Sequence, residues 1–296
     1  MTEIISSLAQ ISGRYDAVFC DLWGCLHDGI KPFPAAVTAL QRYRAAGGIV
    51  LLVTNSPRPK SNVVQQLNAM GCPQDAWDDV TSSGDAAQHA LITGAVGRQV
   101  YHIGAEKDLS FFTDFAEDFK DVASTEPPIE RVALSDARGI VCTGLFDDLT
   151  ETPDDYRARL MLAKTMGLTM LCANPDIIVD FGDRRLYCAG ALAAAYEKMG
   201  GTVLYFGKPH PPIYDLARRR LSALTERADP QILCIGDGIA TDIQGGMSEG
   251  LDTLFVTGGI AAAEFGADSS NPDKDLLDAY LTARQMSVPF AIGGLR

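Results

Sequence analysis

Residues 15–29 constrain the fold more than any other part of the chain. Within them, residues 17–20 are entirely apolar, and the run ends abruptly in Asp21, which is followed by Trp23 and Gly24. An apolar run that ends in one acid is typical of a buried parallel strand that carries a functional side chain to the carboxyl edge of a sheet. We therefore expect an α/β fold with Asp21 at the edge where ligands bind.

Short apolar runs alternate with segments of helical spacing along the whole chain. This alternation favours a parallel sheet, because consecutive parallel strands need a long crossover connection. The predicted strands are residues 17–20, 49–53, 99–104, 139–143, 168–173, 203–206, 232–235 and 253–256. The predicted helices are residues 1–12, 34–46, 60–70, 152–166, 190–199, 212–224, 241–249 and 272–284. The acidic segment 111–130 is harder to assign, and Pro127 and Pro128 predict a loop inside it.

A change of composition near residues 81–85 indicates where the chain leaves its first domain. These residues are small and polar, which is typical of a hinge. A second set of strands and helices follows, and the opening pattern then resumes. We predict an α/β protein with a Rossmann-like, doubly wound parallel-sheet core (residues 1–81 and 190–296) and a smaller inserted α/β domain (residues 82–189).

Charge and cysteine content limit the partners and the compartment. A formal net charge of -13 argues against nucleic acids and anionic membranes, since both require a basic surface. No apolar run approaches the roughly 20 residues of a membrane span, and the first residues lack the basic start of a secretion signal. The seven cysteines are an odd number without a CxxC pair, which predicts buried, reduced thiols. We therefore expect a cytoplasmic protein.

Polar residues follow the predicted core strands. They are Asp21, the run Thr54-Asn55-Ser56, Lys208, and Asp237 with Asp242. The carboxyl ends of parallel strands share one edge of a sheet, so these residues should converge in one crevice. Carboxylates hold Mg²⁺, and a hydroxyl with a lysine holds phosphoryl oxygens. The set therefore indicates phosphoryl transfer.

Four of these runs in this order resemble the motifs of the haloacid dehalogenase superfamily. The resemblance covers nearly the whole chain and is to the branch with a large inserted α/β cap, subclass IIA, which includes pyridoxal, nitrophenyl, nucleotide and sugar phosphatases. Asp21 matches the first motif, residues 54–56 the second, residues 207–209 the third, and residues 236–238 with Thr241 and Asp242 the fourth. His27-Asp28-Gly29 and Asn174-Pro175-Asp176 also fit this branch.

The resemblance implies a nucleophile and a metal site. Asp21 would attack phosphorus and form an aspartyl-phosphate. Asp21, Asp237 and the main-chain carbonyl of Trp23 would bind Mg²⁺, and Asp242 would support the metal or its waters. Asp242 also has a simpler interpretation, as an acid that stabilises the first turn of a helix.

The resemblance also implies phosphate-binding groups. Thr54 would bind a phosphoryl oxygen beside the amides of Asn55 and Ser56. Lys208 would neutralise the charge that Asp21 and the phosphoryl group share.

The inserted domain would act as the cap that excludes water and selects the substrate. Within it, Asn174 and Asp176 would reach toward the substrate, although residues 174–176 could also form only a turn. The histidine that pyridoxal phosphatases carry in this region is absent, which counts against that substrate assignment. The resemblance does not decide between a sugar, a nucleotide and a cofactor phosphate as the substrate. A homodimer is an open expectation, since cap-mediated dimers are common among similar proteins.

Trp23 departs from the phosphatase pattern. Phosphatases of the superfamily normally have a second aspartate there, which protonates the leaving alcohol, and an indole cannot replace it. Three hypotheses follow. The first is a Mg²⁺-dependent phosphatase with slow or selective turnover, with His27 or Asp28 as a substitute acid. The second is a metal-independent dehalogenase-like hydrolase, and the third is a phosphate-ester binding protein that has lost turnover.

Overall fold

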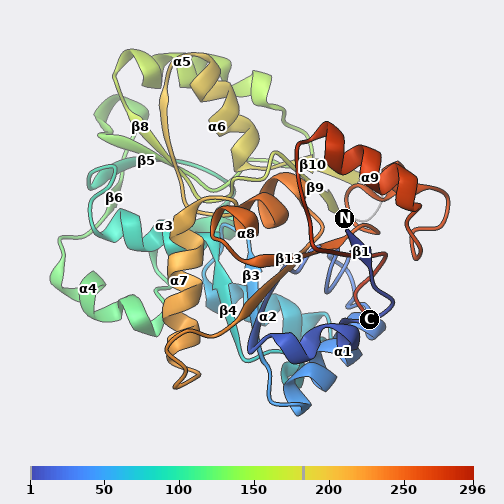
Figure 1. Ribbon diagram of the computed structural model, residues 1–296. Helices are drawn as coiled ribbons and strands as arrows, with labels where there is room; N and C mark the ends of the chain where they lie inside the picture. The colour runs from blue at the N-terminus through green and yellow to red at the C-terminus, as the bar shows by residue number, and fades with distance from the viewer. Residues whose placement is uncertain (1, 182–183) are drawn as a thin grey trace. The chain divides into compact units, whose positions relative to one another are not determined.

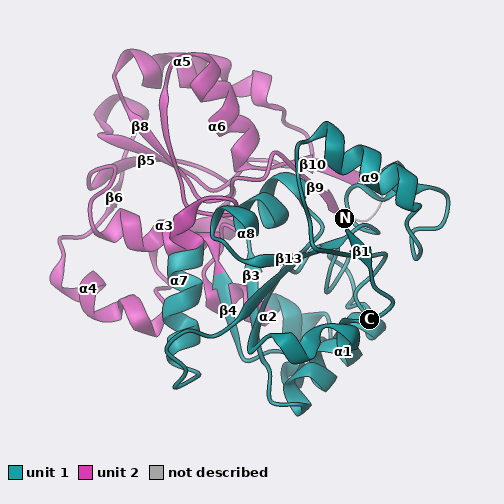
Figure 2. Cartoon of the chain, viewed as in Figure 1, with its two compact units in different colours: residues 1–54, 66–81, 214–296 teal, residues 55–65, 82–213 magenta. Residues whose placement is uncertain are grey.

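The computed structural model describes residues 2–181 and 184–296 (Figure 1). Within this part of the chain, no helix has both the length and the apolar character needed to cross a membrane. The chain forms two compact units (Figure 2): unit 1 contains residues 1–54, 66–81 and 214–296, and unit 2 contains residues 55–65 and 82–213. Both units are α/β, as the sequence predicts.

Unit 1 is built on a seven-stranded sheet. Its strands, in spatial order, are β1 (Glu3–Ile4), β14 (Phe290–Ile292), β13 (Asp252–Val256), β12 (Ile232–Gly236), β2 (Ala17–Cys20), β3 (Ile49–Thr54) and β4 (Asp79–Ser82). The pairings from β1 through β3 are all parallel. Every residue of β2 is buried, and β2 pairs with β12 on one side and β3 on the other. The predicted parallel-sheet core is therefore confirmed, and the strand before Asp21 lies inside it.

Helices α1 (Pro34–Ala45), α8 (Gln244–Ser248) and α9 (Lys274–Ala283) belong to unit 1, and α7 (Pro211–Ser222) belongs largely to it. Helix α2 (Lys60–Ala69) crosses the boundary, since residues 60–65 belong to unit 2 and residues 66–69 to unit 1. Helix α1 begins at Pro34, where the missing backbone N–H removes no hydrogen bond, because the first N–H groups of a helix have no partner within it. The helix is followed by Gly47, whose φ of 94° lets the chain leave the helical path. Asp273 caps α9 by accepting hydrogen bonds from the backbone N–H groups of Asp275 and Leu276.

Unit 2 has its own parallel sheet of five strands. In spatial order they are β11 (Thr202–Tyr205), β8 (Thr169–Cys172), β7 (Gly139–Cys142), β5 (Gln99–Ile103) and β6 (Glu130–Arg131). Two antiparallel strands, β9 (Ile178–Phe181) and β10 (Arg184–Tyr187), form a separate two-stranded sheet. The helices of this unit are α3 (Ser83–Ile92), α4 (Lys120–Thr125), α5 (Arg157–Thr165) and α6 (Ala189–Lys198).

Short helical turns complete both units. They are η1 (Leu8–Gln10), η2 (Ser12–Arg14), η3 (Gln74–Ala76), η4 (Glu106–Phe112), η5 (Glu117–Phe119), η6 (Leu134–Asp136), η7 (Pro153–Tyr156), the π-helical η8 (Ile239–Ile243) and η9 (Ala262–Phe265).

The prediction that residues 203–206 continue the core sheet is wrong. This segment is β11, and it pairs in parallel with β8 at the edge of the unit 2 sheet. The preceding helix α6 also packs there, because Leu192 and Tyr196 are buried against the apolar side chains of unit 2. The Tyr196 hydroxyl donates a 2.6 Å hydrogen bond to the carbonyl of Leu168. Unit 2 therefore extends to residue 213, whereas the predicted inserted domain ends at residue 189.

The chain passes from unit 1 to unit 2 between Thr81 and Ser82, where the change of composition predicts that the chain leaves its first domain. Residues 81–85 form the end of β4 and the start of α3. There the hydroxyl of Ser82 accepts a 3.0 Å hydrogen bond from the N–H of Asp85, which is ordinary helix capping. Residues 2–12 differ from the predicted helix of residues 1–12, since this segment contributes β1 to the edge of the sheet and then makes 3-10 turns.

Candidate active site

Asp21 and Asp237 lie at the ends of two neighbouring strands of unit 1. In the pairing of β2 with β12, Cys20 is opposite Ile235, and the N–H of Asp21 donates a 2.8 Å hydrogen bond to the Ile235 carbonyl. Asp237 follows β12 directly, after Gly236. Both acids are only 8% exposed. The register of the sheet thus brings two buried carboxylates to one edge.

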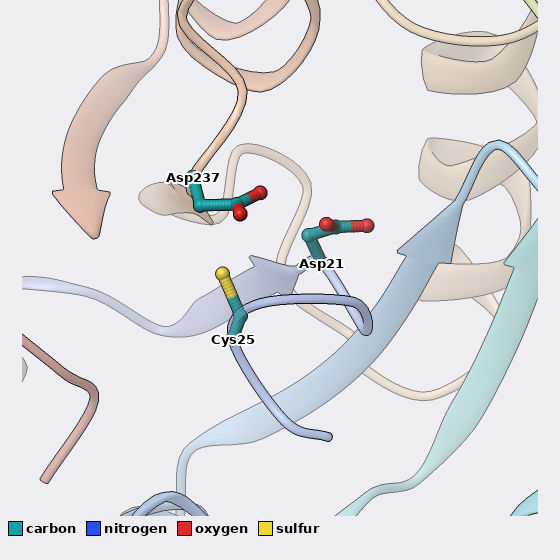
Figure 3. Close-up of side chains that lie close together, drawn as sticks. All are labelled: Asp21, Cys25 and Asp237. Carbon is teal, nitrogen blue, oxygen red and sulfur yellow. The ribbon is translucent and has the colours of Figure 1, made fainter. Parts of the chain in front are cut away.

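A third side chain joins these two acids (Figure 3). One carboxylate oxygen of Asp21, one of Asp237 and the Sγ atom of Cys25 all lie within 4.8 Å of one another. All three residues are buried. Cys25 lies in the turn that follows β2, and the sequence interpretation treated it only as a buried thiol. The structure thus adds it to the predicted site.

Two glycines let the backbone approach the Asp237 carboxylate closely. A Cβ atom on Gly24 or on Gly259 would lie 2.0 Å from Asp237 Oδ2, which no real side chain tolerates. Gly24 also has φ 72°, a conformation that other residues rarely adopt. The N–H of Ile260 donates a 2.8 Å hydrogen bond to the same oxygen. Asp237 is therefore held in a fixed orientation toward Asp21.

The group of Asp21, Cys25 and Asp237 fits a cation. Two carboxylates about 5 Å apart repel each other by roughly 3 kcal/mol at an effective dielectric constant of about 20, and a cation between them removes this cost. Carboxylate oxygens are the ligands that Mg²⁺ prefers. The pKa of the Cys25 thiol is raised well above its usual value, mainly by burial and further by the charges of Asp237 and Asp21.

Trp23 is part of the tightly folded turn between β2 and α1. The Leu22 carbonyl accepts hydrogen bonds from the N–H groups of Leu26 (2.7 Å) and His27 (3.0 Å). The Trp23 indole meets the His27 ring edge-on, with centroids 5.2 Å apart. A Cβ on Gly29 would lie 2.3 Å from the indole, so this glycine leaves room for the ring. Trp23 therefore packs within its own turn.

The two residues considered as substitute acids have other partners. Nδ1 of His27 accepts a 3.1 Å hydrogen bond from the Gly29 N–H, and burial lowers the pKa of His27 to about 4. Oδ1 of Asp28 accepts hydrogen bonds from the N–H groups of Ile30 (2.9 Å) and Lys31 (2.8 Å), and the pKa of Asp28 is lowered chiefly by these bonds. At neutral pH His27 is neutral and Asp28 is ionised, so neither is a ready proton donor.

Asp242 shapes the loop that carries Asp237. Its Oδ2 atom accepts hydrogen bonds from the Gly238 N–H (3.2 Å) and the Thr241 hydroxyl (3.3 Å). A Cβ on Gly236 would lie 2.1 Å from the Cβ of Asp242. Among the residues that the structure describes, Asp242 is not a member of the group of Asp21, Cys25 and Asp237. Its role toward a metal stays a prediction.

Asn55 joins two predicted motifs within unit 2. Its Nδ2 donates to Asp176 Oδ1 (2.8 Å) and to the Lys208 carbonyl (3.0 Å), and its Oδ1 accepts from the Lys208 N–H (2.7 Å). Asn55 and Lys208 are each only 3% exposed. The Asn55 side chain thus fixes the backbone on both sides of the lysine. The sequence predicted the proximity of these motifs but not this role.

The other residues that the sequence predicts to bind the substrate are Asn174, Ser56 and Thr54. Asn174 Oδ1 accepts a 2.9 Å hydrogen bond from the Asp176 N–H, which closes a turn. The Ser56 carbonyl accepts a 2.9 Å hydrogen bond from the Gly84 N–H. Thr54 ends β3 in unit 1 and is 2% exposed. The predicted substrate-binding roles of these residues stay predictions.

A buried acid that the sequence interpretation missed lies in unit 2. The Asp108 side chain is 5% exposed, with its Oδ1 3.8 Å from the Nε atom of Arg58 and its Oδ2 3.4 Å from the Thr143 hydroxyl. Burial raises the pKa of Asp108 above its ordinary value, against the opposing effects of Arg58 and Lys107. No sequence signal marks this residue, because several other acidic residues lie near it in the sequence.

Comparison with known proteins identifies the family. A family model described as haloacid dehalogenase-like hydrolase matches residues 18–116, and a second, related model matches residues 205–282. The ribonucleotide monophosphatase NagD of Escherichia coli K12 is 34% identical over 258 residues, which cover 83% of this chain and 89% of NagD. The chain belongs to the haloacid dehalogenase-like hydrolases. The resemblance predicted from the sequence motifs is confirmed.

Solved structures of the family agree with this assignment. A haloacid dehalogenase-like hydrolase from Brucella suis 1330 is 39% identical, covers 99% of this chain and 100% of its own, and superposes with a TM-score of 0.84. The glycerol phosphate phosphatase of Mycobacterium tuberculosis, solved in complex with calcium, is 25% identical with a TM-score of 0.61. That match covers 84% of this chain and 68% of the mycobacterial one.

We predict that Asn55→Ala destabilises the protein by about 2 kcal/mol or more, because it removes the hydrogen bonds that Asn55 makes with the buried N–H and carbonyl of Lys208. Asn55→Asp should cost more, since it keeps the acceptor but loses the donors and places a carboxylate beside Asp176. Urea denaturation measures both effects. Asn68→Ala, on the exposed face of α2, is the control and should change stability by less than about 0.5 kcal/mol. Equal stability of Asn55→Ala and Asn68→Ala would contradict the prediction.

The second prediction concerns Asp108 and pH. A raised pKa means that the folded protein binds this proton more tightly than the unfolded chain, so stability decreases as pH rises through the raised pKa. Asp108→Asn removes the charge. We expect this variant to be at least as stable as the wild type at pH 7, with the difference vanishing as pH falls to about 4, near the ordinary aspartate pKa.

Thermal unfolding of both proteins between these two pH values measures the effect. Asp148→Asn, which removes the partner of Lys107 in a partly exposed ion pair, is the matched control. A large loss of stability in Asp108→Asn at pH 7 would show that the charge of Asp108 stabilises unit 2 through Arg58, and would refute the prediction.

Proposed function

We propose that this protein is a Mg²⁺-dependent phosphatase of a small phosphorylated metabolite, with Asp21 as the nucleophile. The observation that carries the proposal is the close approach of Asp21 and Asp237 at the carboxyl edge of a parallel sheet. Named relatives support the reaction class, since NagD is a ribonucleotide monophosphatase and YutF of Bacillus subtilis, 25% identical over 270 residues, is a 5'-nucleotidase. The substrate would be a sugar, nucleotide or cofactor phosphate.

The metal would be held by the carboxylates of Asp21 and Asp237, with the carbonyl of Trp23 and, around its waters, Asp242. A bound divalent cation supplies positive charge that offsets the repulsion between the nucleophile and the phosphate oxygens. The complex of the mycobacterial glycerol phosphate phosphatase with calcium supports a divalent ion in this family.

The chemical step would proceed on Asp21. Its carboxylate oxygen forms a bond to phosphorus while the bond from phosphorus to the leaving oxygen breaks, which gives an aspartyl-phosphate and an alkoxide. Lys208 would neutralise the phosphoryl charge, and Thr54 would hold a phosphoryl oxygen beside the amides of Asn55 and Ser56. Water would then attack the aspartyl-phosphate and release inorganic phosphate.

Trp23 limits the rate of this step, because the alkoxide needs a proton that an indole cannot give. Leaving groups with a low pKa need no such proton, so aryl phosphates should react faster than alkyl phosphates.

The packing of Trp23 against His27, together with a neutral His27 and an ionised Asp28, favours one second candidate. This candidate is a phosphate-ester binding protein with little or no turnover. The retention of Asp237 beside Asp21 argues against a metal-independent dehalogenase-like hydrolase.

The third prediction tests the reaction class. Phosphate release from a panel of phosphorylated metabolites should require Mg²⁺ and stop on addition of EDTA, and Asp21→Asn should reduce it to background. Colorimetric phosphate detection measures all three. Activity that survives chelation would refute the metal requirement. Absence of turnover on every substrate, with phosphate esters still bound in a calorimetric assay, would favour the binding protein.

The fourth prediction tests the role of Trp23. General acid catalysis is worth about 10²- to 10⁴-fold in rate, so Trp23→Asp should raise alkyl-phosphate hydrolysis by about tenfold or more and change p-nitrophenyl phosphate hydrolysis much less. Trp23→Phe is the matched control, because it keeps an aromatic ring without adding an acid. A folded Trp23→Asp variant whose alkyl-phosphate rate equals that of Trp23→Phe would rule the explanation out.

A further inference from the structure

Helix α3 begins against the run that leads from the second motif into helix α2. The N–H of Gly84 donates a 2.9 Å hydrogen bond to the Ser56 carbonyl. The next residue, Asp85, accepts a 2.9 Å hydrogen bond on Oδ1 from the N–H of Lys60, the first residue of α2. Both ends of residues 56–60 are thus attached to the first turn of α3, and all of these residues belong to unit 2 (Figure 2).

The contact between α3 and this run leaves no space for a side chain on Gly84. A Cβ atom there would lie 2.3 Å from the Pro57 carbonyl oxygen and 2.6 Å from that of Arg58. Within the run, the Arg58 N–H donates a 3.3 Å hydrogen bond to the Ser56 hydroxyl oxygen, and proline restricts φ at residues 57 and 59. The run is therefore stiff, and its position depends on its attachment to α3.

Asp85 is 0% exposed and supports the first turns of two helices. Its own N–H donates a 3.0 Å hydrogen bond to the Ser82 hydroxyl oxygen, and its carboxyl group receives the first N–H of α2 from Lys60. The first N–H groups of a helix lack partners within it and carry the positive end of its dipole, so a carboxyl group is favourable there. Loss of the Asp85 carboxyl group would therefore release the start of α2 and the run before it.

The same turn of α3 lies against the third motif. A Cβ atom on Gly207 would lie 2.7 Å from the Ser83 hydroxyl oxygen and 2.4 Å from Asn55 Oδ1. Asn55 in turn binds both backbone groups of Lys208. Within unit 2, the first turn of α3 thus contacts both runs to which the proposed function assigns phosphate-binding groups.

We propose that Asp85 is a positioning residue for phosphate binding. Its carboxyl group holds the N–H of Lys60 and thereby sets where the backbone amides of Asn55 and Ser56 lie. Hydrogen bonds weaken steeply when their distance or angle departs from the optimum, so a displaced run binds the phosphoryl oxygens less tightly. The inference rests on the proposed function, which assigns these oxygens to the two amides. Asp85 acts through the backbone alone and is not a catalytic residue.

The experiment measures binding of inorganic phosphate to the full-length protein with Mg²⁺ by isothermal titration calorimetry. We expect Asp85→Ala to weaken binding about tenfold or more, because one hydrogen bond to a charged group contributes at least that much. Asp85→Asn keeps an oxygen acceptor for the Lys60 N–H, so its affinity should stay within about threefold of the wild type.

Asp273→Ala is the matched control for the loss of a helix cap. The Asp273 side chain also accepts hydrogen bonds from backbone N–H groups at the start of a helix, and α9 carries none of the predicted site residues. This variant should lose stability and keep its affinity for phosphate.

Enzyme kinetics separates positioning from a purely structural role. Partial unfolding lowers the amount of active protein and therefore kcat, whereas weaker binding of the phosphoryl group raises KM. For p-nitrophenyl phosphate, we expect Asp85→Ala to raise KM more than it lowers kcat, and Asp273→Ala to leave KM unchanged. Asp85→Glu, whose longer side chain displaces the carboxyl group, gives the same readout if the alanine variant does not fold.

Two outcomes would overturn the role of Asp85. One is a folded Asp85→Ala variant with the phosphate affinity and KM of the wild type. The other is an Asp85→Asn variant that loses as much affinity as Asp85→Ala, because the hydrogen bond from Lys60 would then not be the cause.

Failure of this inference can be told apart from failure of the proposed function. Phosphate release by the wild type tests the function, and the ratio of phosphate affinities between the wild type and Asp85→Ala tests Asp85. Phosphate release with equal affinities overturns only the role of Asp85. Weakened phosphate binding in Asp85→Ala, without phosphate release from any substrate by the wild type, supports Asp85 and overturns the phosphatase.

Discussion

Unit 1 holds two acidic side chains, Asp21 and Asp237, so close together that their negative charges repel each other. Parallel pairing of β2 with β12 places Asp21 and Asp237 at adjacent strand ends, and both are almost fully buried. The strands cannot relax this arrangement, because β2 is a central strand with every residue buried. The fold therefore accepts an electrostatic cost at one edge of its sheet, which is typical of sites built for a cation. Chemistry that requires a cation follows from this constraint more directly than from any single motif.

Much of this arrangement could be predicted from the sequence, because its cause is local. The apolar run before Asp21 and the run before Asp237 have the length and composition of buried parallel strands, and both acids follow them directly. Parallel strands have one common carboxyl edge, so the approach of the two acids follows from the pattern alone. The family assignment rested on the same residues and is confirmed by the comparisons.

Other features could not be predicted, and the reasons are physical. Residues 202–205 are as apolar as the core strands, so their composition does not indicate that they pair with β8 rather than with the core sheet. Cys25 resembles a small apolar residue in sequence, and only the turn after β2 directs its sulfur toward the acids. Asn55 matched a phosphate-binding motif, but the structure shows its side chain bonded to Lys208 and Asp176. A sequence motif therefore predicts where a residue lies in the fold more reliably than it predicts which groups the residue contacts.

The boundary between the two compact units falls between Thr54 and Asn55, inside the second motif. The backbone of Lys208 is thus held by a residue that lies far outside residues 82–213 in sequence. A fragment of residues 82–213 alone would lose both of these hydrogen bonds to the buried Lys208 backbone. For the same reason, exchanging this unit between relatives requires transfer of residues 55–65 along with it. Unit 2 is therefore encoded in two separate pieces of the sequence, and these pieces must change together.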